Sequence, residues 1–388
     1  MPISPEGPID SRLGCLMLAP TGLTFISDWA ATVSAFANVV LVSVVSALPA
    51  DVDRISRKVA RISRDGWQVI FLRHRRLRPT RWFWRLNARL ESRIVLRALR
   101  AHEPPIPFDV IHSHFYAAAA PARHLARRLG IPYVHTEHSS NLAAPDPGKY
   151  VSSSGMAMMR LVFGAAAVVT FVGKNQLAAA ESLRLPGRFT ILPNPVQPAC
   201  FAVKAASSER RRRLVTVGDL IPRKRHDLLL RAFALVHARD PAVELDIVGA
   251  GPEEPRLRDL LRDLDIGTAA RLLGALPREA VAETLSRSDL YVHTSERESF
   301  GVSIVEALLT GLPIVSVRCG GVTDELSPHS SIVIESDEPA ELARAIEAAL
   351  RSERFVDPGT IATWALEHYG PSEVAGRIRA VYLRALRA

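Results

Sequence analysis

The segment Glu298-Ser-Phe-Gly-Val-Ser-Ile-Val-Glu306 says more about this chain than any other. Its two carboxylates stand eight positions apart, and a helical apolar pattern begins at Gly301 between them. The segment leads through Gly311-Leu-Pro313 into the apolar run Ile314–Val317, which indicates a strand. Backbone N–H groups at a helix start bind phosphate, and carboxylates accept hydrogen bonds from sugar hydroxyls. The pattern favours a site for a sugar-bearing nucleotide diphosphate, although a strand–loop–helix unit with two solvated glutamates would contain the same residues.

Length and composition indicate two globular domains. The chain has 388 residues, which is more than one ordinary core accommodates. Hydrophobic residues make up 48% and charged residues 23%, values typical of a folded chain. The cysteines Cys15, Cys200 and Cys319 lie far apart, so they predict neither a disulfide framework nor a zinc site and fit a reducing compartment.

Positive charge is concentrated in residues 54–100, which hold fifteen Arg and Lys but only two acids. Such a segment suggests an anionic partner, and the alternative is arginine enrichment from a GC-rich genome. Within it, Arg73–Arg85 mixes arginines with tryptophans, and a basic amphipathic helix is expected to continue to Arg100. This mixture favours the surface of an anionic membrane. Nucleic acid is not expected as a partner, because no recognised nucleic-acid module accompanies the charge.

The N-terminal region has two interpretations. The run Trp29–Ala50 carries no charge and is long enough to span a bilayer. Val39–Val45 within it has the pattern of a buried parallel strand, which is the interpretation we prefer. The first charged residues include two acids and do not form the basic cluster of a signal peptide. Residues 1–36 are therefore predicted to be an extension before the first core strand.

Apolar runs and helical patterns alternate in both halves, which is typical of doubly wound parallel sheets. The strands predicted in the first half are Val39–Val45, Gln68–Leu72, Asp109–His112, Tyr133–Thr136, Val168–Phe171 and Thr190–Leu192. The strands predicted in the second half are Leu214–Val217, Leu245–Val248, Leu290–His293, Ile314–Val317 and Ile332–Ile334. The spacing also predicts a helix over Asp53–Ile62 and a last helix over Pro371–Leu386.

Glycines and basic residues follow two strands of the second half. Gly218 ends a strand and precedes Arg223 and Lys224, a combination suited to holding a diphosphate. Gly249-Ala-Gly251-Pro follows the next strand, but this motif is weak and a plain turn also explains it. His293, just before the Glu298 segment, is interpreted as structural.

Histidines follow two strands of the first half. His138 lies at the carboxyl end of a predicted strand, where ligands bind in parallel sheets, although a structural histidine is the alternative. His112 and His114 end the preceding strand, and His114 is a weaker candidate for the same site. The spacing of His and Asp residues predicts no metal site.

These motifs resemble the retaining glycosyltransferases with the two-domain GT-B fold, in the large family numbered four among carbohydrate-active enzymes. The Glu298–Glu306 segment resembles the Glu-x7-Glu signature of that family. The segment from Gly218 resembles its Gly-Arg-Leu-x-x-x-Lys-Gly motif, with Lys224 at the lysine but Asp219 at the arginine. His138 matches a Thr-x-His segment. The resemblance covers about residues 39–388.

The resemblance implies two Rossmann-like domains facing a cleft. Residues 37–196 would form the acceptor domain, 197–212 a linker and 213–365 the donor domain. Residues 366–388 would form a helix that crosses back to the first domain. The implied catalytic residues are Glu298, Lys224 and His138. The implied donor-binding residues are Glu306, Phe300, Gly301, Val302, Gly218, Arg223 and Gly249.

The implied activity is transfer of a sugar from a UDP- or GDP-sugar to a glycan or lipid-linked acceptor, in cell-envelope or exopolysaccharide synthesis. No cofactor or metal is expected, and a cytoplasmic protein bound peripherally to the inner membrane face is expected. A sugar-nucleotide epimerase or hydrolase of the same fold is one alternative. A non-catalytic membrane-associated assembly component is another, which Asp219 slightly favours. The donor sugar, the base and the acceptor stay open.

Overall fold

The computed structural model describes residues 13–20, 24–45, 59–64, 67–73, 80–101, 107–144, 146–203, 212–351 and 355–388. The chain divides into two compact units. The first contains Met1–Val172, Gln176–Pro195 and Val374–Ala388, and the second contains Gly173–Asn175 and Val196–Glu373.

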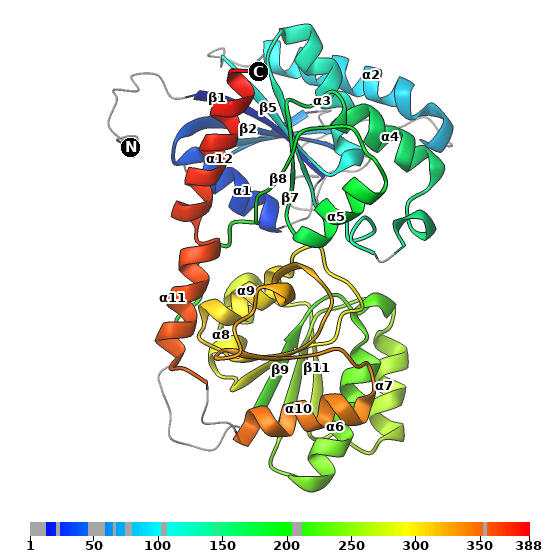
Figure 1. The fold of residues 1–388 in the computed structure, drawn as a ribbon, viewed down its shortest axis with the longest axis vertical. Coiled ribbons are helices and arrows are strands. Elements are labelled where there is room, and N and C mark those ends of the chain that lie inside the picture. The colour runs from blue at the N-terminus through cyan, green and yellow to red at the C-terminus, as the bar shows by residue number, and fades with distance from the viewer. Residues whose placement is uncertain are drawn as a thin grey trace. The chain divides into compact units, whose positions relative to one another are not determined.

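The first unit is built on an eight-stranded sheet with the strand order β3-β4-β2-β1-β5-β6-β7-β8 (Figure 1). Its strands are β1 Leu13–Leu18, β2 Ala37–Val45, β3 Val59–Arg64, β4 Trp67–Arg73, β5 Val110–His114, β6 Tyr133–Glu137, β7 Val168–Phe171 and β8 Phe189–Ile191. Neighbouring strands are parallel except β3 and β4, which are antiparallel. The strand order reverses between β1 and β5, and ligands bind such sheets beyond the carboxyl ends at that reversal.

The central strand of this sheet lies in the segment predicted to be an extension. β1 pairs with both β2 and β5, and only its first residue is not fully buried. The prediction for residues 1–36 is therefore wrong from residue 13 onward, and residues 1–12 lie outside the described part of the chain. The sequence of β1, Leu-Gly-Cys-Leu-Met-Leu, has no β-branched or aromatic residue, so the usual strand signal is missing. Gly14 is required, because a Cβ there would lie 1.7 Å from the carbonyl oxygen of Pro107.

The helix predicted over Asp53–Ile62 is also wrong in the part that the structure describes. Val59–Arg64 forms β3, whereas residues 53–58 lie outside the described residues. Val59 and Ile62 have helical spacing, but pairing with β4 along the whole of β3 overrides that local signal. The uncharged run from Trp29 is divided between helix α1, Thr24–Ser34, and strand β2.

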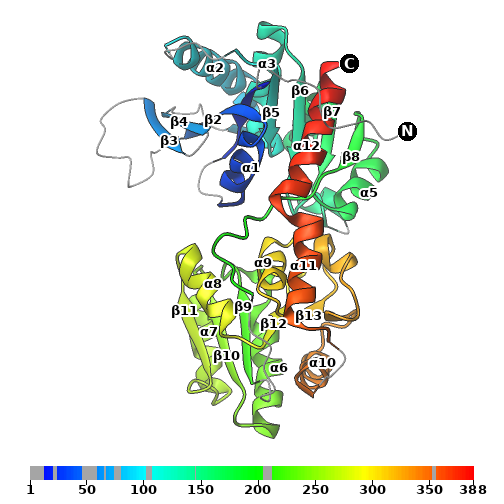
Figure 2. The same ribbon diagram turned by 90° about the vertical axis from the view of Figure 1, so that its left-hand side faces the viewer.

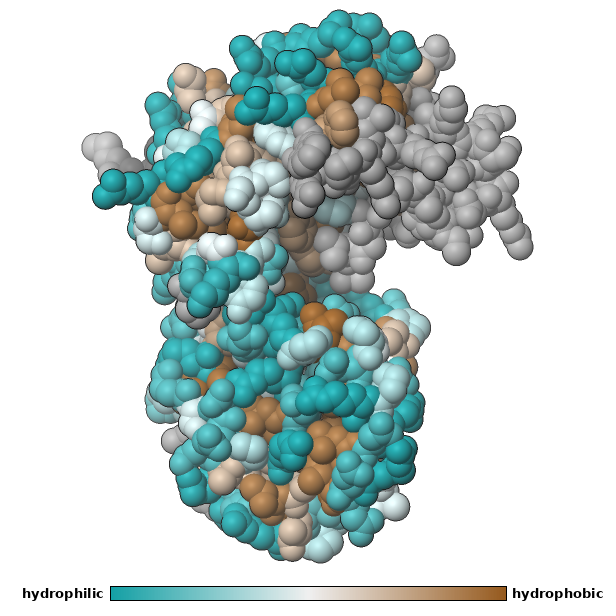
Figure 3. Space-filling view, turned by 90° about the vertical axis from the view of Figure 1, so that its right-hand side faces the viewer, coloured by the Kyte–Doolittle hydropathy of each residue, from teal (hydrophilic) through white to brown (hydrophobic). Residues whose placement is uncertain are grey.

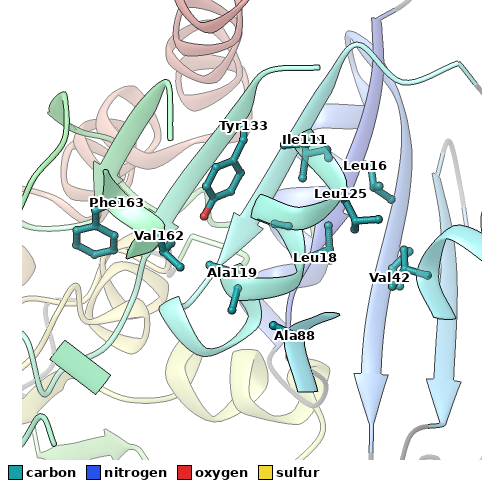
Figure 4. Packing of buried hydrophobic residues seen from close by; sticks show 14 of the residues in the cluster. Leu16, Leu18, Val42, Ala88, Ile111, Ala119, Leu125, Tyr133, Val162 and Phe163 are labelled. Carbon is teal, nitrogen blue, oxygen red and sulfur yellow. The ribbon is translucent and has the colours of Figure 1, made fainter. Parts of the chain in front are cut away.

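Helices cover both faces of the first sheet (Figure 2). They are α1, α2 Thr80–Arg100, α3 Tyr116–Leu129, α4 Ser153–Phe163, α5 Lys174–Ser182 and α12 Pro371–Leu386. One core joins the strands to α2, α3 and α4, and Figure 4 shows part of it, including Leu16, Ile111 and Leu125. The other core joins the strands to α1 and α12.

The last helix has the predicted bounds and packs on the first sheet. Val374, Ile378, Tyr382 and Ala385 of α12 are at most 2% exposed and share a cluster with Trp29. Their spacing of three and four residues places them on one side of the helix. The end of the chain therefore completes the core that β1 and α1 begin.

The second unit contains a six-stranded parallel sheet with the order β11-β10-β9-β12-β13-β14. Its strands are β9 Arg213–Val217, β10 Glu244–Val248, β11 Ala270–Gly274, β12 Leu290–His293, β13 Ile314–Val317 and β14 Ser331–Ile334. Its helices are α6 His226–Arg239, α7 Glu254–Asp263, α8 Arg278–Ser286, α9 Val302–Leu309, α10 Pro339–Arg351 and α11 Pro358–Tyr369. The strand order reverses between β9 and β12, so the segments after these two strands are the expected ligand site.

The surface is mixed in character. On the face that Figure 3 presents, hydrophilic residues predominate and hydrophobic residues appear in scattered patches. None of the helices within the described ranges is both long and apolar enough to cross a membrane.

Candidate active site

The carboxyl ends of β9 and β12 bring the predicted residues of the second unit together. Gly218 follows β9, and the short 3-10 helix Pro222–Lys224 comes just after it. The loop after β12 carries Glu298 and leads into α9 at Gly301. The reversal of strand order makes β9 and β12 neighbours, which is why residues 74 positions apart in sequence meet here.

Glu298 is the centre of this cluster. Its Oε1 accepts hydrogen bonds from Lys224 Nζ at 2.6 Å and from Ser295 Oγ at 2.8 Å. Arg223 Nη1 lies 3.5 Å from the same oxygen and donates to the carbonyl oxygen of Arg297 at 2.8 Å. Burial alone would raise the pKa of this carboxyl, but Lys224, with smaller effects of His293 and Arg223, holds it well below the ordinary value. Glu298 is therefore ionised.

His293 belongs to the same cluster, which extends the structural role predicted for it. Its Nε2 lies 3.5 Å from Glu298 Oε1, and the side chain is buried. Burial lowers the pKa of His293 despite the neighbouring carboxylate. The ring stacks on Tyr291, whose hydroxyl donates to Ser303 Oγ of α9 at 2.8 Å. His293, the last residue of β12, thus packs against the loop that carries Glu298.

The two predicted glycines differ in how strictly the geometry requires them. A Cβ at Gly218 would lie 3.4 Å from Lys224 Cε, an ordinary contact distance, so Lys224 packs against this position without requiring a glycine. Gly249 has a φ of 143°, and a Cβ there would lie 1.9 Å from the carbonyl oxygen of Gly218. Gly249 therefore supports the Gly218 turn from the neighbouring strand.

The loop between Glu298 and α9 is fixed by its backbone. Glu298 N donates to the carbonyl oxygen of Cys319 at 2.7 Å, and Val322 N donates to that of Phe300 at 2.7 Å. Gly301 has a φ of 97° and precedes the first residue of α9, Val302. The first N–H groups of a helix have no acceptor within it and carry partial positive charge. The N–H groups at the start of α9 are therefore suited to binding an anion. The Phe300 carbonyl, which accepts from Val322 N, holds the loop in place and takes no part in this.

Glu306 of α9 lies in a second, adjoining group that includes a residue the sequence analysis missed. Arg278 Nη2, from the start of α8, is 3.6 Å from Glu306 Oε1 and donates to the carbonyl oxygen of Gln197 at 3.3 Å. Its guanidinium also lies over the Phe201 ring, 5.4 Å from the centroid. The only signal in the sequence was a basic residue directly after Leu276-Pro277.

The cation that could replace the arginine missing at Asp219 is Arg223. Asp219 is exposed, and its carbonyl oxygen lies 3.2 Å from His226 Nε2. Arg225, the next basic residue along the chain after Lys224, donates to Asp337 Oδ2 at 2.9 Å and is engaged there. Arg223 instead contacts the loop that carries Glu298.

The first unit brings its predicted histidines together at the ends of β5 and β6. His138 Nε2 and His114 Nδ1 share a hydrogen bond of 2.9 Å. Burial, followed by the neighbouring histidines, lowers the pKa of both well below 6.5. Phe25 and Phe115 each lie 5.0 Å from the His138 ring, centroid to centroid. The pair is therefore neutral and enclosed by aromatic rings, so it offers hydrogen bonds but no charge.

Glu137 fixes this end of the sheet. It is fully buried and accepts from the backbone N–H groups of Tyr116, His138 and Ser139 at 2.7–2.9 Å. Phe115, between β5 and α3, has a φ of 63°, a strained value for a non-glycine residue and one that clusters near functional sites. The carboxylate therefore holds the β5 and β6 ends in one arrangement.

His112 lies deeper and has a structural role. Its Nδ1 shares a 2.8 Å hydrogen bond with Tyr382 Oη of α12, and its Nε2 shares one of 2.6 Å with Thr136 Oγ1. Burial lowers the pKa of His112 to about 3. The Tyr382 hydroxyl also lies 3.3 Å from Cys15 Sγ of β1. These contacts fasten α12 to the sheet.

The basic segment is only partly described, because residues 54–58, 65–66 and 74–79 lie outside the described ranges. The expected helix is α2, on which four arginines at intervals of four residues are exposed: Arg85, Arg89, Arg93 and Arg97. Phe83 is 40% and Leu86 43% exposed on the same helix.

Among the described residues, no group of three or more His, Cys, Asp or Glu side chains is arranged to hold a metal ion.

Comparison with protein families gives two matches that follow each other along the chain. The family described as "Glycosyltransferase Family 4" matches residues 37–199. The family described as "Glycosyl transferases group 1" matches residues 201–357.

Curated relatives include the D-inositol 3-phosphate glycosyltransferase of Acidothermus cellulolyticus, 31% identical over 296 residues, which are 68% of this chain and 63% of that protein. A phosphatidylinositol N-acetylglucosaminyltransferase subunit from Arabidopsis thaliana is 29% identical over 283 residues, which are 72% of this chain and 62% of that protein. The chain thus spans less than two thirds of the length of these relatives.

Similar solved structures include sucrose-phosphate synthase from Thermosynechococcus elongatus, with a TM-score of 0.77 and 15% identity over 96% of this chain and 99% of that one. HepE of Anabaena in complex with UDP-glucose has a TM-score of 0.73 and 17% identity over 95% of this chain and 99% of that one. These similarities show that the two sheets form the GT-B fold.

Proposed function

Since the chain belongs to the group 1 glycosyltransferase family, we propose that it is a retaining enzyme that transfers a sugar from a UDP- or GDP-sugar to a glycan or lipid-linked acceptor. The observation that carries the proposal is the partly buried ion pair between Lys224 and Glu298, with nitrogen and oxygen 2.6 Å apart. The pair lies where the strand order reverses and beside the start of α9. It combines a cation for a diphosphate with a carboxylate for sugar hydroxyls.

Donor binding exchanges the partners of this pair. The ammonium of Lys224 turns from Glu298 to the diphosphate, and Glu298 Oε1 then accepts hydrogen bonds from the sugar. Arg223, which already contacts the Glu298 loop, takes the place of the arginine absent at Asp219. Glu306 accepts from ribose hydroxyls, with Arg278 beside it. The HepE structure with UDP-glucose supports a uridine nucleotide as the first donor to test.

The chemical step breaks the bond between the anomeric carbon and the diphosphate oxygen, through an oxocarbenium-like sugar. Lys224 and the N–H groups at the start of α9 stabilise the negative charge that develops on the departing phosphate. The acceptor hydroxyl attacks from the same face and gives its proton to that phosphate, so the configuration is retained without a protein base. His138, being neutral, orients a hydroxyl through a hydrogen bond and does not neutralise phosphate.

We further propose that transfer needs no metal or other cofactor, since Lys224 and Arg223 provide the positive charge that a cation would otherwise supply. The acceptor is proposed to be presented at the cytoplasmic face of an anionic membrane, in cell-envelope or exopolysaccharide synthesis. The exposed arginines of α2, together with Phe83 and Leu86, support this location. Both relatives carry inositol compounds in their names, which makes an inositol-bearing acceptor the first class to examine.

Nucleotide release from a panel of UDP- and GDP-sugars tests the proposal, with and without a membrane lipid extract and with EDTA in a parallel series. Glu298→Gln removes the central carboxylate, and Glu283→Gln, at an exposed position on α8, is the matched control. Release from one donor that increases with extract, persists in EDTA and is lost only in Glu298→Gln supports a transferase.

Other outcomes would contradict specific parts of the proposal. Release that does not depend on the extract would favour the epimerase or hydrolase. Donor binding without release would favour a non-catalytic assembly component. An inverted anomeric configuration of the product, determined by NMR, would overturn the retaining mechanism.

A further inference from the structure

A cavity of about 290 Å³ lies between α2, α3 and α4 of the first unit. Its lining contains Trp84, Asn87 and Glu91 of α2, Tyr116 and Ala117 of α3, and Ser152 and Ser154 at the start of α4. The volume is near the lower end of small-molecule sites, which begin at about 300 Å³. Nothing in the predicted site included this place.

The topology puts the cavity on the ligand-binding side of the sheet. α2, α3 and α4 follow β4, β5 and β6, so the first turns of these helices lie by the carboxyl ends of those strands. The lining comes from the middle turns of α2 and from the first two turns of α3 and α4. Tyr116 also donates its backbone N–H to Glu137, the carboxylate that holds the backbone of His138.

The chemistry of the lining fits a hydroxylated ring. Trp84, Asn87 and Glu91 have helical spacing, so one side of α2 presents an aromatic ring, an amide and a carboxylate to the cavity. Asn87 is 4% and Glu91 3% exposed, although both belong to residue types that are mostly found on the surface. A carboxylate has about four acceptor positions, so Glu91 can accept ligand hydroxyls in addition to contacts within the protein. The Trp84 ring offers an apolar face to the C–H groups of a sugar or cyclitol.

The charge pattern orients such a ligand. At the edge, the Arg85 guanidinium lies over the Trp84 ring, 5.2 Å from its centroid. The pKa of Arg123 on α3 is lowered, mainly by burial and further by the positive charges of Arg127 and Arg85. Positive potential therefore extends from α2 to α3. A phosphate attached to the ring would therefore lie outside, by Arg85.

We propose that this cavity binds the sugar or cyclitol ring of a phosphorylated acceptor, with the ring between Trp84 and Glu91 and the phosphate at Arg85. The inference rests on the proposed function only in calling the ligand an acceptor. A free ring phosphate and the headgroup of a lipid share this chemistry. The two sources are separated by experiment.

Binding is measured by calorimetry on the full chain, independently of turnover. The probes are D-inositol 3-phosphate, myo-inositol, and vesicles of phosphatidylcholine with or without phosphatidylinositol. Ala117→Leu fills the cavity from an exposed helix position and should fold normally. Ala157→Leu is the matched control, because Ala157 is exposed on α4 and does not line the cavity.

Ala117→Leu and Glu91→Gln are expected to weaken binding of the inositol probe at least tenfold, whereas Ala157→Leu leaves it unchanged. Arg85→Gln should weaken the phosphorylated probe but not myo-inositol. Binding of the soluble probe identifies a free ring phosphate, and binding only of phosphatidylinositol vesicles identifies a lipid headgroup.

Binding that Ala117→Leu does not change, or no binding of any inositol probe, would overturn the proposal. Loss of binding in Ala117→Leu by a protein that releases no nucleotide from any donor would keep the cavity assignment and refute the proposed function instead.

Discussion

The two sheets end in opposite kinds of chemistry at the points where their strand orders reverse. In the second unit, Glu298, Lys224 and Arg223 form a charged cluster in which two cations contact one carboxylate. In the first unit, His114 and His138 form a neutral pair within an aromatic enclosure. A diphosphate needs cations, whereas a hydroxyl acceptor needs oriented hydrogen bonds. On the proposed function, the same topology would serve two ligands through the side chains at the strand ends and not through the fold itself.

The largest effect is expected in the charged cluster. Glu298→Gln keeps the shape of the side chain but removes the charge that pairs with Lys224, so turnover should fall about 10²–10³-fold, as for other electrostatic groups in active sites. His138→Gln should cost clearly less, because a neutral hydrogen bond is replaced by another. Steady-state rates with one donor give both values. A larger loss for His138→Gln would reverse the contrast between the two sheets.

The second effect concerns the stability of the first unit, which should depend on the hydrogen bonds around its buried histidines. Tyr382→Phe removes the hydroxyl that the buried His112 and Cys15 contact, which should cost about 1–3 kcal/mol of unfolding free energy. Urea denaturation of this variant beside the unaltered protein measures the loss, and equal midpoints would show that the α12 contact is dispensable.

Acid should destabilise the first unit more than the second. His112, His114 and His138 have pKa values lowered from 6.5, to about 3 for His112, so below about pH 6.5 the unfolded chain binds protons that the folded unit does not. Stability is therefore complete above that pH and falls as the pH drops towards 3, by up to about 1.4 kcal/mol per pH unit for each histidine. In the second unit, the pKa of His226 is lowered to about 4 and that of His293 is lowered too. Because these are two histidines against the three named in the first unit, the second unit should lose less stability.

Hydrogen exchange at pH 7.5 and pH 5, corrected for intrinsic rates, measures the loss in each unit separately. The amides of the first unit should lose more protection on acidification. Equal losses in the two units would contradict the expected difference.

The smallest effects concern the surface of α2. Each arginine near an anionic membrane contributes about 1 kcal/mol, so Arg89→Gln with Arg93→Gln should lower affinity for anionic vesicles by roughly tenfold or more. The reduction should shrink at high salt, because the interaction is screened. Arg258→Gln with Arg262→Gln, exposed on α7 of the second unit, is the control in vesicle sedimentation. Equal loss in both double variants would indicate nonspecific charge.

The charged site could be predicted because its residues lie in short, contiguous motifs. Glu298 and Lys224 each follow a strand with β-branched residues, and the sequence alone assigns both to the site. Ser295 and Arg278 were missed, because a serine in a loop and an arginine at a helix start have no distinctive pattern. Their importance arises from the neighbours that the fold brings to them.

The fold of the first unit was less accessible to prediction for a similar reason. β1 has no β-branched residue, and it is a strand because β2 and β5 flank it. β3 has helical spacing but pairs with β4. The contact of His112 with Tyr382 joins residues 270 positions apart, and no local pattern records such a distance. Local sequence predicts the structure where strands are rich in β-branched residues and motifs are short. Such prediction fails where contacts with distant parts of the chain determine the structure.

The placement of α12 has a consequence for the order of folding during synthesis. The second unit is complete in sequence by Glu373, whereas the first still lacks Val374, Ile378 and Tyr382, which fill its core beside Trp29. Domains generally fold in the order in which they are made, but here the part begun first is finished last. A nascent chain would therefore hold an apolar face of the first sheet uncovered while the second unit folds. That interval is when a chaperone would be needed most.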